Sequence, residues 1–269
     1  MPSKQEIFRR GSTTYYFSSI FFPPDVREKV FTLYAYVRTA DDYVDAVPQD
    51  AAGFYRLKQM TLDALEGRKV PDVIISEFID LSQKEQIKKE WILAFLSAME
   101  QDLTVKIYET YQDLETYMYG SAEVIGLSMA RILNLPEKSL KAAQLQGKAM
   151  QLVNFIRDIK EDLTFQRIYI PQEDLQKFHI TELNEHVDQE LFSALIRFET
   201  ERYLILQKEA ESGYAYIPRR YRIPVQTASS MYNWTARQII QNPMMIFQKK
   251  IRPHPLRVMS AVTKYLLTG

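Results

Sequence analysis

The distribution of proline is the strongest constraint on how this chain folds. Proline interrupts a helix because it lacks an N–H donor and clashes with the preceding turn. Pro48, Pro71, Pro136 and Pro171 bracket long proline-free stretches. Within these stretches apolar residues recur at the i, i+3, i+4 spacing of an amphipathic helix, and no series of alternating strands is evident. The sequence therefore predicts an all-α fold, with helices packed around a common centre.

The helical spacing divides the chain into predicted helices. The first begins at Asp25, after two consecutive prolines, and continues to about Val44. The others are expected near residues 50–66, 84–103, 110–134, 137–162, 188–212, 225–241 and 255–267. No linker, low-complexity tract or fixed repeat interrupts the 269 residues, so we expect one domain over residues 1–269.

Composition excludes several classes of function. Acidic and basic residues balance at 34 each, so we expect no nucleic-acid partner, because binding to phosphate backbones depends on excess positive charge. The absence of cysteine excludes disulfides, thiolate metal sites and cysteine nucleophiles, and it suits a cytoplasmic protein. The three histidines lack zinc-ligand spacing. The N-terminus lacks the apolar core of a signal peptide, and the stretch from Tyr15 to Pro24 is too short to span a membrane.

A polar stripe marks the predicted helix that ends near Val44. Tyr34, Arg38, Asp41 and Asp45 are spaced i, i+4, i+7, i+11, which places them on one helical face. Two carboxylates one turn apart can bind a hard divalent ion, and a guanidinium suits the oxygens of a diphosphate. If this cluster stood alone, an exposed helix end with an i, i+4 salt bridge would explain it about as well as a metal and diphosphate site.

A second polar stripe lies in the predicted helix 137–162. Gln151, Asn154, Asp158 and Asp162 are spaced i, i+3, i+7, i+11, and the residues between them are mostly apolar. Burying carboxylates is costly unless a cation or a donor compensates them. Two such stripes that face each other would repel without metal, so we predict a single site that binds Mg²⁺, with Mn²⁺ as an alternative, together with a diphosphate.

At these residues the chain resembles the squalene/phytoene synthase family, from about Phe8 to the last helix. The first motif is Tyr34-x-x-x-Arg38-x-x-Asp41-Asp42-x-x-Asp45, and the second is Gln151-x-x-Asn154-x-x-Arg157-Asp158-x-x-x-Asp162, followed by Arg167-Ile-Tyr169-Ile-Pro171. The stretch from Tyr117 to Gly126 resembles a further family segment. Because glycine costs up to about 1 kcal/mol inside a helix, Gly120 and Gly126 indicate close packing or room for substrate.

The resemblance implies both a fold and a reaction. The fold is an isoprenoid-synthase-type helical bundle around a central cavity. The reaction joins two prenyl diphosphates head to head through a cyclopropylcarbinyl diphosphate, with metal and arginines stabilising the leaving diphosphate. Apolar and aromatic walls exclude water from the carbocation, and tyrosine faces can stabilise it.

The resemblance also implies roles for individual residues. It assigns metal binding to Asp41, Asp45, Asn154, Asp158 and Asp162. It assigns diphosphate contacts to Arg38, Arg157 and Arg167, and substrate contacts to Ser12, Ser19, Gln151 and Tyr232. Tyr34 and Tyr117 are candidates for steering the intermediate or a proton.

Several positions depart from the family pattern. Ser12-Thr13-Thr14-Tyr15 lacks a lysine that many members carry near the start, and Lys249-Lys250-Ile251 stands where an Arg-Arg-Val-like stretch is common. Ser19 occupies a position where C15-using members tend to have phenylalanine. A serine there leaves room for a longer chain, so we expect two C20 geranylgeranyl diphosphates and phytoene as product, although Phe31 or Ile217 can shorten the cavity.

Other functions stay open at this point. Squalene or dehydrosqualene synthesis from two farnesyl diphosphates is the first alternative, and NADPH is expected only if the product is squalene. Chain-elongating prenyltransferases and terpene cyclases also carry an Asp-Asp-x-x-Asp motif like the one at Asp41 to Asp45. Their second motifs differ from the one at Asn154 to Asp162, which makes them weaker alternatives. A non-catalytic helical scaffold or assembly factor is the alternative of a different class.

The product of such a reaction is too apolar to remain in water. We therefore expect a cytoplasmic protein with a peripheral contact at the inner membrane face or with a downstream desaturase. The segment Lys249–Arg257 is basic and partly apolar, which suits an anionic lipid surface.

Overall fold

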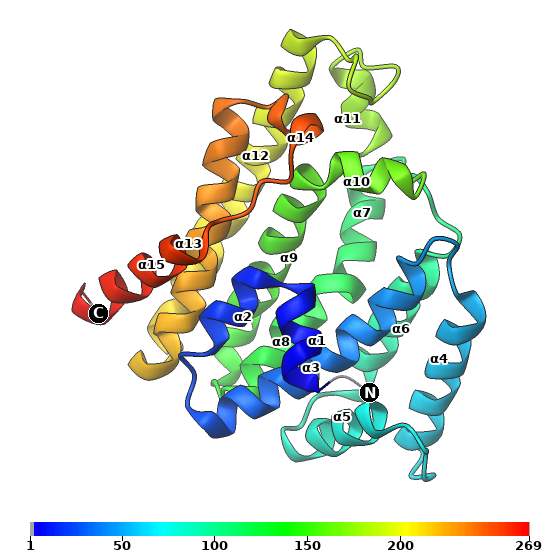
Figure 1. Ribbon diagram of the computed structural model, residues 1–269, viewed down its shortest axis with the longest axis vertical. Coiled ribbons are helices and arrows are strands. Elements are labelled where there is room, and N and C mark those ends of the chain that lie inside the picture. Colours follow the sequence, from blue (N-terminus) through cyan, green and yellow to red (C-terminus); the bar gives the residue numbers. More distant parts are fainter. Residues whose placement is uncertain (1–2, 269) are drawn as a thin grey trace.

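The computed structural model describes residues 3–268, and the predicted all-α class is confirmed (Figure 1). Within that range the only sheet-like pairing is an isolated bridge between Ile107 and Ile168. The elements in chain order are α1 (Lys4–Gly11), α2 (Thr13–Ser19), α3 (Pro24–Val44), α4 (Ala51–Leu65), α5 (Val73–Lys84), α6 (Lys89–Gln101), α7 (Tyr111–Met118), the π-helical η1 (Tyr119–Glu123), α8 (Val124–Ile132), the 3₁₀ turn η2 (Glu137–Ser139), α9 (Leu140–Arg157), α10 (Ile159–Thr164), α11 (Gln172–Lys177), α12 (Gln189–Glu211), the 3₁₀ turn η3 (Ser212–Tyr216), α13 (Arg219–Gln241), α14 (Met245–Gln248) and α15 (Pro255–Thr268).

Helix α9 forms the centre of the arrangement. It packs against α8 and η1 on one side and against α12 and α13 on the other. One apolar core lies mainly among the helices from α1 to α8, and a second is built largely from α9, α12 and α13. The fully buried Leu152 and the nearly fully buried Ile156 of α9 belong to the second core. Since both cores meet at α9, this helix fixes the distance between the two halves of the bundle.

Three glycines allow the helices around the centre to approach closely. A Cβ atom on Gly126 would lie 2.1 Å from the carbonyl oxygen of Ala143, and one on Gly147 would lie 2.3 Å from that of Ala122. A Cβ atom on Gly120 would lie 2.3 Å from the carbonyl oxygen of Ala94. Close packing therefore accounts for the glycines at 120 and 126.

The predicted helices 50–66, 84–103, 188–212 and 255–267 are found with small shifts of their ends. The helix from Asp25 to Val44 is also confirmed. It begins at Pro24, where a proline is tolerated because the first N–H groups of a helix have no partner inside it. Val26, Val30 and Leu33 are buried.

Two single helices predicted from spacing are wrong, because the structure divides each. Residues 110–134 form α7, η1 and α8, and the π-helical turn inserts Gly120 against α6. Residues 137–162 form η2, α9 and α10. The break falls at Asp158, whose backbone leaves the helical region (φ −100°, ψ 11°). Lys160 then donates to the carbonyl of Phe247 at 2.6 Å, which holds α10 at an angle to α9 (Figure 1).

The predicted start of the helix 225–241 is also wrong, since α13 begins at Arg219 and carries Pro224 in its interior. A proline usually marks the first turn of a helix, so the helix was expected to start just after Pro224. In the structure Pro224 is instead buried inside α13, after the first turn. The helices α1, α2 and α5 were not predicted; α1 and α2 are too short for a clear apolar period, whereas α5 has one, with Ile75, Phe78 and Ile79 buried. Their caps are visible in the sequence at Ser3, Ser12 and Asp72, each of which accepts a backbone N–H. No helix among residues 3–268 is long and apolar enough to cross a lipid bilayer.

The contact between α8 and α9 gives a first prediction. We expect Gly126→Ala to destabilise the protein by about 1–3 kcal/mol, because the added methyl overlaps the backbone of Ala143. This corresponds to a Tm that is lower by about 2–4 °C for each kcal/mol. Calorimetry of the variant beside Gln112→Ala, an exposed helical control, measures the effect. An unchanged Tm in Gly126→Ala would contradict the proposed rigidity of this contact.

Candidate functional site

A cavity of about 630 Å³ lies between the helices of the bundle. It is lined by residues from α2, α3, α9, α10 and α13, among other elements. Every site residue singled out by the sequence lines this one cavity: Ser12, Ser19, Tyr34, Arg38, Asp41, Asp45, Tyr117, Gln151, Asn154, Arg157, Asp158, Asp162, Arg167 and Tyr232. Residues more than 200 positions apart in the chain are therefore brought to one space.

The cavity has a charged end and an apolar remainder. The acidic residues lie where α3 and α9 end, with Asp45 as the C-cap of α3 and Asp158 as the C-cap of α9. Earlier turns of the same helices contribute apolar wall, for example Leu33 and Ala143. The C-terminus of a helix carries a partial negative charge, which makes carboxylates there still more costly. This end of the cavity thus concentrates negative charge.

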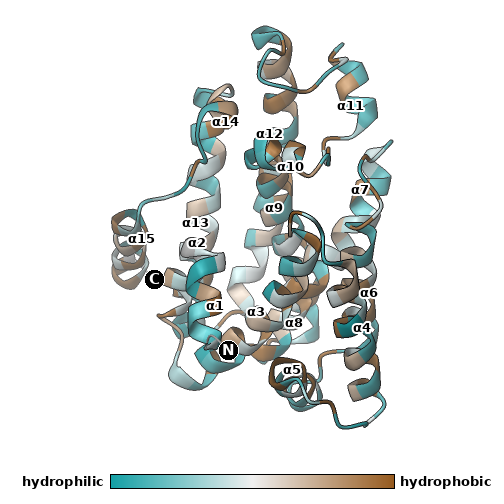
Figure 2. Ribbon diagram, turned by 45° about the vertical axis from the view of Figure 1, so that its right-hand side comes forward, coloured by the Kyte–Doolittle hydropathy of each residue, from teal (hydrophilic) through white to brown (hydrophobic). Residues whose placement is uncertain are grey.

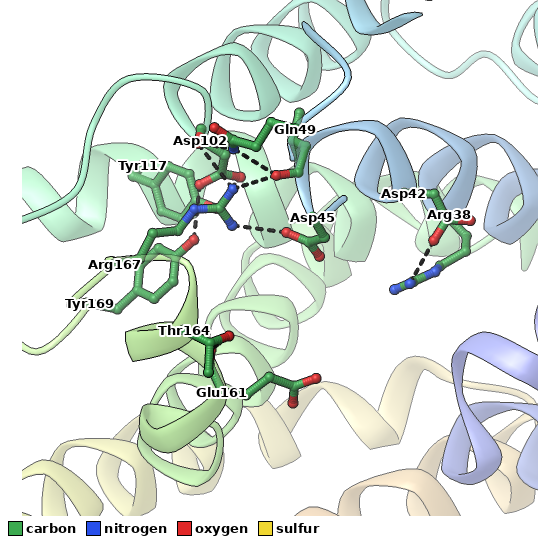
Figure 3. Close-up of polar contacts among 11 residues, drawn as sticks. Arg38, Asp42, Asp45, Gln49, Asp102, Tyr117, Glu161, Thr164, Arg167 and Tyr169 are labelled. Atoms are coloured by element: carbon green, nitrogen blue, oxygen red, sulfur yellow. Dashed lines mark hydrogen bonds and ion pairs between the residues drawn. The ribbon is translucent and has the colours of Figure 1, made fainter. Parts of the chain in front are cut away.

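Internal cations satisfy part of the negative charge. Arg167 contacts Asp45 at 2.8 Å (Figure 3). Arg157 donates to both carboxylate oxygens of Asp158, at 2.9 and 2.5 Å. Lys250, from the segment between α14 and α15, lies 3.3 Å from Asp158 and also contacts Glu161. The hydrogen bond and charge of Arg157 oppose the effect of burial and hold the pKa of Asp158 below its usual value.

Asp41 and Asp162 form no ion pair with any described residue. Burial, reinforced by the charge of Asp45, raises the pKa of Asp41 to about 8. Burial, reinforced by the charge of Asp158, raises the pKa of Asp162 to about 8. A divalent cation would lower both values, because it favours the charged carboxylate.

Asp102 organises the neighbouring part of the site, and sequence reasoning missed it. Its carboxylate accepts hydrogen bonds from Tyr117 and Tyr169, each at 2.9 Å, and its carbonyl accepts from Arg167 at 3.0 Å and from Gln49 at 2.9 Å (Figure 3). Burial raises the pKa of Asp102 to about 6, although the charge of Arg167 opposes this. Asp102 stands alone at the end of a predicted helix, with no polar residues at helical spacing beside it, so nothing in the sequence marked it as a site residue.

Arg167 is more constrained than a surface arginine. Only 4 % of its side chain is exposed, and its two Nη groups donate to Asp45 and to the carbonyls of Val44 and Asp102. Its Nε is buried and donates to no described residue. Arg167 thus fastens the end of α3 to the end of α6. Arg38 behaves differently, since it pairs with the exposed Asp42 at 2.6 Å (Figure 3).

Aromatic residues form much of the remaining wall. Tyr117 lies in a cluster with Tyr108, Phe155 and Tyr169, in which the rings of Phe155 and Tyr169 are stacked 4.2 Å apart. Tyr232 lies 5.6 Å from Tyr15, another lining residue that sequence reasoning did not single out. Burial raises the pKa of Tyr117 and Tyr232, so both phenols are neutral in the ordinary pH range.

The residues expected to set substrate length are not equivalent. Ser19 lines the cavity, and its hydroxyl donates to the carbonyl of Tyr16 at 2.8 Å. Ile217 also lines the cavity. Phe31 instead packs edge-on against Phe8, with ring centres 5.2 Å apart, and does not line it. Of the two residues considered able to shorten the cavity, only Ile217 is therefore in a position to do so.

The oxygen donors at the charged end fit a shared magnesium site. Residues 3–268 contain no group of three or more His, Cys, Asp or Glu side chains able to hold an ion by themselves. However, Asn154 Oδ1 is buried and accepts no hydrogen bond from any described residue, which leaves a carbonyl-type ligand available. Mg²⁺ commonly binds to one or two carboxylates and completes its shell with phosphate and water oxygens. The arrangement suits an ion that arrives with a diphosphate.

The raised pKa of Asp41 gives a prediction about stability without metal. The pKa of this aspartate rises from about 4 in the unfolded chain to about 8 in the folded protein. Between these pH values the folded state binds more protons than the unfolded state, so the free energy of unfolding falls as pH rises. We therefore expect Asp41→Asn to raise Tm at pH 8 in EDTA by about 2–5 °C and to have little effect at pH 5. Asp42→Asn, whose side chain is 58 % exposed, is the matched control. An equal effect of Asp41→Asn at both pH values would contradict the assignment.

Comparison with known proteins places the chain in a family. The model of the squalene/phytoene synthase family matches residues 8–258. A phytoene synthase of Pseudescherichia vulneris is 30 % identical over 240 residues, which cover 82 % of this chain and 76 % of the relative. A 15-cis-phytoene synthase of Synechocystis is 26 % identical over 269 residues, covering 91 % and 78 %.

Solved structures agree on the fold. A dehydrosqualene synthase determined with a ligand superimposes with a TM-score of 0.87 at 24 % identity, covering 99 % of this chain and 96 % of the other. A squalene synthase from Alicyclobacillus acidocaldarius gives a TM-score of 0.79 at 21 % identity, covering 88 % and 92 %. With the family motifs gathered in one cavity and the family model matching nearly the whole chain, this protein belongs to the squalene/phytoene synthase family.

Proposed function

We propose that this protein is a prenyltransferase that condenses two geranylgeranyl diphosphates head to head to give phytoene. The observation that carries the proposal is the single cavity with one charged end and an apolar remainder. Such a space can hold diphosphates at one end and isoprenoid chains along the other. The phytoene synthases among the similar proteins support the choice of product.

Asp41, Asp45, Asn154, Asp158 and Asp162 are the residues that would hold Mg²⁺, or Mn²⁺ in its place. When bound with a diphosphate, the ion would supply positive charge where negative charge develops on the leaving group. Among residues 3–268, Asn154 Oδ1 has no hydrogen-bond partner and the carboxylates of Asp41 and Asp162 have no ion-pair partner, which supports this assignment.

The arginines divide between binding and positioning. Arg38 and Arg157 line the charged end, and each holds a carboxylate that it can exchange for diphosphate oxygens. Arg167 holds Asp45 and two carbonyls, so we assign it mainly to positioning, with its unpaired Nε as the remaining donor toward a diphosphate. Lys250 adds a positive charge beside Asp158.

The remaining lining residues bind the substrate and protect the carbocation. Ser12, Ser19, Gln151 and Tyr232 lie along the cavity and provide wall or hydrogen bonds to the bound substrate. Tyr34 and Tyr117 present aromatic rings that can stabilise a positive charge. The neutral Tyr117 hydroxyl is held by Asp102, so it keeps one orientation during the cyclopropylcarbinyl step and the rearrangement that follows.

Two farnesyl diphosphates are the second candidate substrate pair. A dehydrosqualene synthase superimposes closely on this chain, which supports the fold but not the chain length. Dehydrosqualene formation needs no hydride donor, whereas squalene formation would need NADPH.

An incubation with defined substrates tests the proposal. We expect purified protein with Mg²⁺ and geranylgeranyl diphosphate to give phytoene, identified by mass, and Asp41→Ala and Asp158→Ala to lower the rate at least about 100-fold. Parallel incubations use farnesyl diphosphate, with and without NADPH. A C30 product would contradict the assigned chain length, and the absence of any head-to-head product would favour an elongase, a cyclase or a non-catalytic scaffold.

The contacts of Lys250 give a prediction about metal binding. Its ammonium group occupies space between Asp158 and Glu161, where it competes with a divalent cation. We expect Lys250→Met to raise the affinity for Mn²⁺ without substrate by about two- to tenfold, because one positive charge is removed from the site. Titration calorimetry measures the affinity, and Lys249→Met is the neighbouring exposed control. A weaker affinity in Lys250→Met would show that the lysine does not oppose the metal.

A further inference from the structure

The last helix, α15, exposes several large apolar side chains on the side that faces away from the protein. Its inner face carries Val258 and Val262, which are buried. Its outer face carries four exposed apolar side chains, Leu256 (73 %), Met259 (46 %), Leu266 (52 %) and Leu267 (81 %). Single exposed apolar residues are common, but four along one short helix form a stripe. Figure 2 shows α15 at the edge of the fold, with much of its ribbon in the brown of hydrophobic residues. We call these four residues the outer stripe.

Positive charge is concentrated in the same part of the chain. Residues 212–269 contain nine Lys and Arg residues and no Asp or Glu, whereas the chain as a whole has 34 of each charge. The C-terminal segment is therefore strongly positive within a neutral protein. This segregation gives the molecule an acidic part and a basic part.

Basic side chains lie at both ends of the outer stripe. Lys249 and Arg252 are exposed just before α15, and Arg257 is exposed in its first turn. At the other end Arg219 donates to the carbonyl of Leu266 at 3.2 Å and is also exposed. An apolar stripe flanked by cations is the composition of helices that lie in the interface of an anionic membrane.

We propose that α15 docks on an anionic lipid surface through the outer stripe, with the surrounding lysines and arginines contacting lipid phosphates. A second copy of this chain is a poorer occupant, because two such faces would bring like charges together. Lipid phosphates complement the charge, and the acyl boundary takes up the exposed leucines.

The position of α15 relates this surface to the cavity. The helix packs against α13 and α2, and both of these helices line the cavity through residues such as Val225 and Tyr15. A membrane docked at α15 would thus lie one helix away from the apolar wall. The exposure and charge of this surface are independent of the proposed reaction.

Co-sedimentation with vesicles, measured without substrate, tests the inference. We expect the protein to bind vesicles of equimolar phosphatidylcholine and phosphatidylglycerol, to bind pure phosphatidylcholine at least about tenfold more weakly, and to dissociate at high salt. Leu256→Ser combined with Leu267→Ser should weaken binding about tenfold or more, since both side chains are already exposed and their loss leaves the core intact. Lys249→Gln combined with Arg252→Gln should do the same.

Val73→Ser on α5 is the control, because Val73 is 58 % exposed but lies outside the basic segment. Its binding should match that of the unchanged protein. The inference is overturned by no binding to anionic vesicles or by equal binding of all variants. It is also overturned by a dimer in light scattering that Leu256→Ser with Leu267→Ser converts to a monomer, since a second copy would then cover the stripe.

Discussion

The structure of the charged end depends on the buried guanidinium of Arg167. Three oxygen groups converge on it: the carboxylate of Asp45, the carbonyl of Val44 and the carbonyl of Asp102. The last turn of α3 is thereby fixed to the end of α6 and to the segment after α10. Only 4 % of the Arg167 side chain is exposed, so removing its partners leaves a buried charge uncompensated, which costs far more than losing a surface salt bridge. This contact therefore fixes the position of Asp45, one of the two carboxylates of the stripe on α3.

The sequence was sufficient for the fold class and for bringing the two acidic stripes together. Helical spacing alone placed Asp41 and Asp45 on one face, and the cost of burying Asp158 and Asp162 pointed to a shared site. All four line the same cavity. Spacing failed where local geometry leaves the ideal helix, as at the backbone turn of Asp158 and at the π-helical turn after Met118.

Other parts of the site were beyond sequence reasoning for a physical reason. Asp102 and Tyr15 acquire their roles from partners that are distant in the chain, such as Tyr169 and Tyr232. No periodic pattern marks a residue whose environment is entirely tertiary. Lys250 departs from the family pattern in the sequence, but its contact with Asp158 depends on the segment between α14 and α15, which brings it to the cavity wall.

The glycine contacts between helices restrict how this cavity can change over evolution. Backbone packs directly on backbone where Gly126 of α8 meets α9 and where Gly147 of α9 meets η1, so no compressible side chain separates the elements at these two positions. The width of the cavity is thus set by the main chain, and a mutation cannot easily alter it. Its usable length, in contrast, depends on individual side chains such as Ser19 and Ile217. Selection for a shorter or longer product can therefore act through single substitutions at the cavity wall while the helical frame and the charged end stay unchanged.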